Sequence, residues 1–181
     1  MRKAEEKFGM VLFRNLAGAL AIVWMCIIFA FSAQQKEESG AVSASFTFHM
    51  VSSTRTFFHL DLSDARVKEI SDAIEGFIRK VAHMAEFGIM SVLLYIWVGQ
   101  WEMSFLRRGG TAAGATAIYA ATDEIHQLFV PGRAGRFSDV CIDSAGALAG
   151  VIVFALLVRI VRRMRARRLE RKLRAQQEQN A

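Results

Sequence analysis

The sequence predicts an all-α protein, a polytopic membrane bundle of four transmembrane helices with both termini in the cytoplasm. Hydrophobic residues make up 53% of the chain although 22% of its residues are charged, and the two kinds are segregated along it. Long apolar runs that alternate with short charged segments are typical of polytopic membrane proteins. The chain contains one proline, Pro131, so its helices can run largely without interruption.

We predict a membrane domain over residues 10–161, and its first span covers about residues 10–31. The alternative is a cleaved signal peptide, because Ala30-Phe31-Ser32 resembles a cleavage site. An apolar run of roughly 16–22 residues is longer than the usual signal core and favours an uncleaved helix. The later spans cover about residues 81–101, 110–130 and 140–161, and small residues in the last two would allow close helix packing.

The distribution of Lys and Arg predicts the orientation. Four basic residues lie at or before the start of the first span, and nine follow or end the fourth, which is the pattern of cytoplasmic segments. Residues 162–181 would then form a basic cytoplasmic tail that touches anionic lipid, and we expect no binding of nucleic acid.

The segment 32–78 would lie outside the membrane, between the first two spans. Residues 63–78 predict an amphipathic helix on the outer membrane surface, with Ser63 as its cap. One face of this helix would carry Val67, Ile70, Ile74, Phe77 and Ile78. The sequence does not decide the structure of residues 41–60, where an interfacial and a re-entrant element are both open.

Polar residues of the last three spans are expected at one depth, roughly 5–9 Å below the outer end of each helix at ~1.5 Å per residue. Residues three or four apart share a helix face. Charged groups in hydrocarbon cost roughly 2.5–3.5 kcal/mol each on insertion scales, so they normally pair or line a wet cavity and mark a functional site. The residues at this depth are His83, Glu86, Asp123, His126 and Asp143. Glu124 and Gln127 lie beside them on the third span, and Asp139 stands at the start of the fourth. The alternative is a buried ion-pair network that sets helix register, with Arg133 or Arg136 neutralising the carboxylates.

Three sequence motifs resemble those of the VanZ-like family, named for an accessory teicoplanin-resistance protein. They are Phe29-Ala-Phe-Ser-Ala-Gln34, Arg79-Lys-Val-Ala-His-Met-Ala-Glu-Phe87, and Asp123-Glu-Ile-His-Gln-Leu-Phe-Val-Pro-Gly-Arg133 with the following Asp139, Asp143 and Gly146. Phe87 departs from the pattern, because tyrosine is common there. The resemblance implies a multi-pass protein of the bacterial cell (plasma) membrane and a link to the cell envelope, teicoplanin resistance or another form of antibiotic resistance. The resemblance does not indicate which reaction, if any, the protein catalyses.

Two functions remain open. The first is a binding protein whose outer-leaflet pocket recognises a lipid head group, a lipid-linked cell-wall precursor or a glycopeptide. Its ligand would contact His83, Glu86, Asp123, Glu124, His126, Gln127, Arg133, Asp139 and Asp143. Arg133 and Arg136 suit phosphate or carboxylate, because guanidinium forms forked hydrogen bonds to either.

The second function is an intramembrane enzyme that acts on a lipid or envelope substrate. His83 or His126 would be its general base, and Glu86, Asp123 or Glu124 would orient the histidine or hold a divalent metal. Such ligands suit zinc or manganese, but the spacing is not a diagnostic metal signature. A transporter is disfavoured, because the polar groups stay on one side of the membrane.

Overall fold

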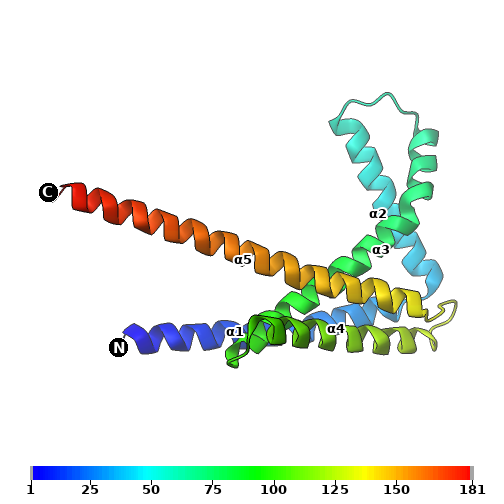
Figure 1. Ribbon diagram of the computed structural model, residues 1–181. Helices are drawn as coiled ribbons and strands as arrows, with labels where there is room; N and C mark the ends of the chain where they lie inside the picture. The colour runs from blue at the N-terminus through cyan, green and yellow to red at the C-terminus, as the bar shows by residue number, and fades with distance from the viewer. Residues whose placement is uncertain (1, 180–181) are drawn as a thin grey trace.

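The structure consists of helices joined by short connections (Figure 1). The computed structural model describes residues 2–179, among which there is no β-strand. The helices are α1 (Arg2–Ser32), α2 (Lys36–Phe57), α3 (Asp64–Trp97), the short 3-10 helix η1 (Val98–Gln100), α4 (Phe105–Gln127) and α5 (Phe137–Gln179). The predicted all-α class is therefore confirmed.

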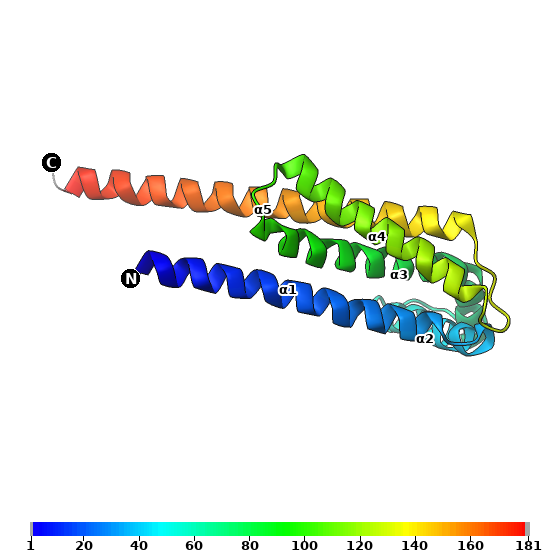
Figure 2. The ribbon, with the colours of Figure 1, turned by 90° about the horizontal axis from the view of Figure 1, so that it is seen from below.

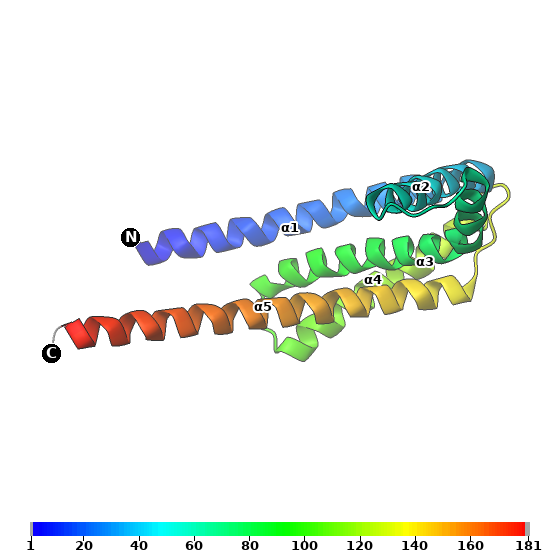
Figure 3. The same cartoon turned by 90° about the horizontal axis from the view of Figure 1, so that it is seen from above.

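A bundle is formed by α1, the second half of α3, α4 and α5 (Figures 2 and 3). Successive bundle helices alternate in direction, so α3 and α5 run parallel to each other and opposite to α1 and α4 (Figure 2). The two ends of the chain consequently lie at one end of the bundle. The connections between α1 and α2 and between α4 and α5 lie at the other end.

Helices α3 and α5 approach each other through three glycines. A Cβ atom on Gly146 would overlap the backbone of Met84, and one on Gly150 would lie 2.5 Å from the carbonyl oxygen of Gly88. A Cβ on Gly88 would in turn lie 3.1 Å from the carbonyl oxygen of Gly146. Small residues four apart let membrane helices pack backbone against backbone, and the order of these contacts sets the register of α3 on α5.

Helix α1 is joined to the bundle by an apolar face and two partly buried hydrogen bonds. Ile28 packs in a core cluster with Phe87, Met90 and Ala120. The indole of Trp24 donates to the backbone oxygen of Glu86 (2.9 Å), and the hydroxyl of Tyr119 donates to that of Met25 (2.7 Å). Trp24 and Tyr119 thus pack their rings between helices while the indole N–H and the phenol O–H each have a hydrogen-bond acceptor.

The outer segment forms a helical hairpin. Residues 41–60, which the sequence left undecided, fall in α2 and the turn after it, and α2 packs on the first part of α3. Ser63 is the N-cap of α3, as predicted, and its hydroxyl accepts from the backbone N–H of Arg66. Val67 and Ser71 are buried, whereas Phe77, expected on the same face as Val67, is 68% exposed.

The predicted amphipathic stretch, residues 63–78, leads directly into the predicted second span. The amphipathic stretch and the second span form one continuous helix, α3, from Asp64 to Trp97. No proline or cap residue separates the two parts, so the hydrogen-bond ladder continues. Figure 3 shows α3 changing direction between the part that packs on α2 and the part that lies beside α5.

Among residues 2–179, three helical segments are long and apolar enough to cross a membrane: Phe8–Ser32, Asp64–Gln100 and Phe137–Arg171. Helix α4 is not among them, which differs from the four spans predicted. It begins at Phe105 rather than 110 and ends at Gln127 rather than 130. Its Ala, Gly and Thr residues and its polar carboxyl end lower its mean hydropathy. The basic tail predicted from residue 162 continues α5 without a break.

We expect Gly146→Ala to lower the free energy of unfolding by about 1–3 kcal/mol, because the added methyl group must push α3 and α5 apart. Gly114→Ala on α4 is the matched control, because no atom lies within 4 Å of its Cβ position. Both variants gain the same helix propensity, so this effect cancels. Thermal unfolding of the purified protein in detergent measures the difference, and equal stability of the two variants would contradict the packing described.

Candidate functional site

A cavity of about 310 Å³ lies at the end of the bundle away from the chain termini. Its walls come from the end of α1, the first half of α2, the middle of α3, one residue of α4 and the loop before α5. Its polar lining residues are Ser32, Gln34, Ser39, Ser43, Arg79, His83, Glu86, Asp123 and Arg133. The remaining lining residues are apolar, chiefly Ile28, Phe31, Val42, Phe46 and Ile78. The cavity therefore combines a charged part with an apolar wall.

One face of α3 supplies three charged or titratable side chains. Arg79, His83 and Glu86 follow each other at spacings of four and three residues, so they point to the same side of the helix. Arg79 also forms an ion pair with Glu75 one turn earlier, and its buried Nε atom has no hydrogen-bond partner among the described residues. Arg79 was not among the predicted site residues, although its spacing to His83 is readable in the sequence.

His83 lies between carboxylates of two helices. Its Nδ1 atom is 3.9 Å from Oε2 of Glu86 on α3 and 4.0 Å from Oδ1 of Asp143 on α5. These distances exceed a hydrogen bond. Asp143 is fully buried, and one oxygen each of Asp143 and Asp123 is buried without a hydrogen-bond partner among the described residues. Buried polar atoms are normally satisfied, and because Asp123 lines the cavity, its oxygen is available to a ligand or to water.

The loop between α4 and α5 places Arg133. The backbone N–H of Arg133 donates to the carbonyl oxygen of Val130 (3.1 Å), and between them stand Pro131 and Gly132, whose φ is 75°. A β-turn with proline second and a positive-φ glycine third is of type II. A Cβ on Gly132 would lie 3.3 Å from Cβ of Lys36, so the turn packs closely on the first turn of α2.

The guanidinium of Arg133 holds the end of α1. It donates to the backbone oxygens of Gln34 (Nε, 3.0 Å) and Phe31 (3.2 Å). The carbonyl oxygen of Phe31 also accepts from the backbone N–H of Gln34 (3.2 Å), and arginine side chains commonly bind carbonyl groups at helix ends. Burial lowers the pKa of Arg133, but an arginine keeps its charge through such shifts. Arg133 thus lines the cavity and also fixes one of its walls.

Glu124 and Gln127 support the loop rather than line the cavity. The amide of Gln127 donates to Asp123 (3.0 Å) and Glu124 (3.3 Å). The other carboxylate oxygen of Glu124 accepts from the backbone N–H of Arg136 (2.8 Å), where α5 begins. A carboxylate at this position also suits the positive end of the helix dipole.

The remaining predicted residues lie outside the cavity. The ring of His126 packs on Phe29, with a centroid distance of 4.2 Å, and Asp139 accepts from the hydroxyl of Ser138. Arg136 has an exposed side chain and contributes only its backbone N–H to Glu124. Of the predicted residues, His83, Glu86, Asp123 and Arg133 line the cavity, and Asp143 lies beside it. Glu124 and Gln127 support the loop, and the others lie elsewhere.

The divalent metal expected for an enzyme can be compared with the ligand groups present. Within residues 2–179, as far as their side chains are described, no group of three or more His, Cys, Asp and Glu residues is placed to hold a metal ion. His83, Glu86 and Asp143 come nearest to such a set through the distances given above.

An all-helical chain with three apolar helices of membrane-spanning length and a polar cavity at one end defines a helical membrane protein. Residues 17–159 match the family model VanZ/LLP1. The chain belongs to this family, and the resemblance drawn from the motifs is confirmed. No curated protein and no solved structure matches the chain.

We expect Glu124→Ala to destabilise the fold by about 1–3 kcal/mol, because the N–H of Arg136 and the amide of Gln127 lose a charged acceptor. Glu124→Gln should retain most of the stability, because an amide oxygen still accepts from the N–H of Arg136. Glu102→Ala, at an exposed site, is the control for loss of one negative charge. Thermal unfolding in detergent compares the three, and a Glu124→Ala protein as stable as Glu102→Ala would refute this supporting role.

Proposed function

We propose that the cavity binds the polar head group of a membrane lipid of the cell envelope, such as a lipid-linked cell-wall precursor. The observation that carries the proposal is that two guanidinium groups, of Arg79 and Arg133, line the same cavity as two carboxylates, of Glu86 and Asp123. The cavity also has an apolar wall. Such a ligand has an anionic part, hydroxyl or amide donors, and a hydrocarbon chain.

Each part of this ligand has a complement in the cavity. Guanidinium groups bind phosphate or carboxylate through paired hydrogen bonds, and Arg79 has a buried Nε without a partner among the described residues. The free oxygen of Asp123 can accept from a hydroxyl or amide group. Val42 and Phe46 of α2 offer an apolar surface for the start of the chain.

The volume favours a head group over a whole glycopeptide. Small-ligand pockets usually measure about 300–1,000 Å³, and this cavity, at about 310 Å³, is at the lower limit. The link to teicoplanin tolerance is therefore proposed to act through the envelope lipid rather than through capture of the antibiotic.

The proposal includes a topology of four crossings with both termini in the cytoplasm of a bacterial cell. Helix α4 returns the chain from the end of α3 to the start of α5 beside these two helices. It is therefore proposed to cross the membrane although its own hydropathy is low. Its buried polar residues meet other protein groups rather than lipid, which lowers the cost of insertion.

An intramembrane enzyme is the second candidate, and the position of His83 favours it. An imidazole between Glu86 and Asp143 resembles a general base oriented by a carboxylate, although catalytic hydrogen bonds are often long before substrate binds. His126 is not suited to this role at the cavity, because its ring packs on Phe29 outside it.

Single-cysteine labelling tests the four crossings. With Cys26 and Cys141 replaced by serine, we expect Ser104→Cys and Ala134→Cys to react with an impermeant maleimide from opposite sides of the membrane. Both positions are exposed and lie in the connections on either side of α4. Labelling of both from the same side would show that α4 does not cross.

Titration of the purified protein with a lipid-linked cell-wall precursor tests the binding function. We expect saturable binding that Arg79→Gln weakens roughly 10- to 100-fold, because a charged hydrogen bond contributes about 1.5–3 kcal/mol. Arg66→Gln is the matched control on the same helix, because Arg66 pairs with Glu69 on the exposed surface. Arg133 is unsuitable for this test because it also holds α1.

The same samples distinguish the alternatives. Equal affinities of the Arg79→Gln and Arg66→Gln proteins would exclude this cavity as the binding site. Tighter binding of teicoplanin than of the precursor would identify the glycopeptide as the ligand. Conversion of the precursor to a product, lost in His83→Gln, would establish the enzyme instead.

A further inference from the structure

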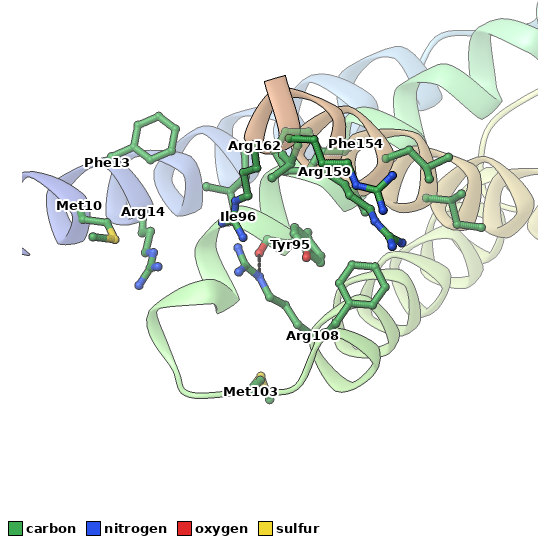
Figure 4. Close-up of a pocket in the computed structure, with 16 residues that line it drawn as sticks. Met10, Phe13, Arg14, Tyr95, Ile96, Met103, Arg108, Phe154, Arg159 and Arg162 are labelled. Carbon is green, nitrogen blue, oxygen red and sulfur yellow. Dashed lines mark hydrogen bonds between the residues drawn. The ribbon is translucent and has the colours of Figure 1, made fainter. Parts of the chain in front are cut away.

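A second and larger cavity, of about 870 Å³, lies toward the end of the bundle where the chain termini are. Figure 4 shows residues that line it. It is enclosed by the first part of α1, the end of α3, the start of α4 and the middle of α5. Five arginines line it: Arg14, Arg108, Arg159, Arg162 and Arg163. Its lining residues, all within the described part of the chain, include no carboxylate.

Arg108 is held in place at this cavity. Its Nε donates to the backbone oxygen of Tyr95 (2.7 Å), and its guanidinium lies over the Tyr95 ring, 4.1 Å from the centroid. A Cβ on Gly99 would overlap this guanidinium, so the glycine makes room for it. Ordered in this way, the half-buried Arg108 loses little freedom when it binds an anion.

Among the side chains that the structure describes, no carboxylate forms an ion pair with any of these five arginines. The ion pairs of the described side chains involve Arg55, Arg66, Lys68, Arg79 and His83, and none of the five arginines around the cavity. Like charges in one cavity repel each other, and the repulsion is strongest where water is partly excluded. An anion that binds among Arg14, Arg108 and Arg162 would relieve this repulsion.

Apart from these arginines and Tyr95, the lining is apolar. It includes Phe13, Ile96, Phe105, Phe154 and Leu156. Trp97 and Trp101 stand together at the same end of α3, with ring centroids 5.5 Å apart, and tryptophan is enriched where membrane meets water. A ligand for this cavity must therefore join an anionic group to a hydrocarbon part.

We propose that this cavity binds one anionic phospholipid from the leaflet that faces the chain termini. The phosphate would contact Arg108, with Arg14 and Arg162 beside it, and an acyl chain would follow the apolar wall between α1 and α5. This site is separate from the cavity of the proposed function and does not depend on it. It also differs from general attraction of the basic tail, because it requires one lipid at a defined place.

Native mass spectrometry of the full-length protein, released from micelles that contain phosphatidylglycerol, measures this binding. We expect one phosphatidylglycerol to remain bound at activation energies that remove phosphatidylcholine. Arg108→Gln should weaken retention roughly tenfold, in line with loss of a charged hydrogen bond. Arg168→Gln, an exposed arginine further along α5, is the control and should leave retention unchanged.

Arg14→Gln provides a second variant, because no hydrogen bond or ion pair of the described side chains involves Arg14, so its loss should not disturb folding. We expect it to weaken phosphatidylglycerol retention as well. Equal retention of phosphatidylcholine, or an equal loss in Arg168→Gln, would overturn the proposal in favour of general charge attraction. Competition by inorganic phosphate or glycerol phosphate as effective as that by the lipid would overturn it in favour of a small-anion site.

Discussion

The close parallel contact of α3 with α5 is the constraint on which the rest of the structure depends. Because Gly88, Gly146 and Gly150 have no side chains, the two backbones meet at these positions, and a side chain at any of them would crowd the facing helix. The resulting register brings His83 of α3 within 4.0 Å of Asp143 of α5. A buried carboxylate alone in hydrocarbon would be costly, so the same glycines that allow packing also provide the polar residues with neighbours.

The two ends of the bundle differ in their charge chemistry, although both are bounded by arginine. At the end away from the termini, Arg79 and Arg133 share a cavity with Glu86 and Asp123. At the other end, the lining described contains arginine alone. A cavity with both signs of charge can discriminate among head groups by their donors and acceptors, whereas a purely cationic one selects chiefly for negative charge. The first is therefore suited to recognition and the second to anchoring in a leaflet.

Local patterns in the sequence predicted the helical class and the Ser63 cap, because each depends on neighbours a few positions away. Helix α2 has no clear apolar face, and its packing on α3 depends on tertiary contacts, so it was not predicted. Arg133 meets acceptors 99 and 102 residues away in the sequence, which no spacing rule reveals. The sequence predicted Glu124 as a ligand-binding residue, whereas the structure shows it accepting from the backbone N–H of Arg136. This contact depends on how the loop folds back, which the sequence does not reveal.

The contacts of Arg133 favour the proposed binding cavity over an ion-pair network that sets helix register. In such a network the arginine would neutralise the carboxylates, but here it donates to the backbone oxygens of Phe31, in α1, and Gln34, just after it. Asp123 and Asp143 each keep a buried oxygen without a partner among the described residues. Register is already set by glycine contacts, so the acids are not needed for it. Polar atoms that are buried, unsatisfied and beside an open cavity are costly for folding alone, and their retention is explained when a ligand completes their hydrogen bonds.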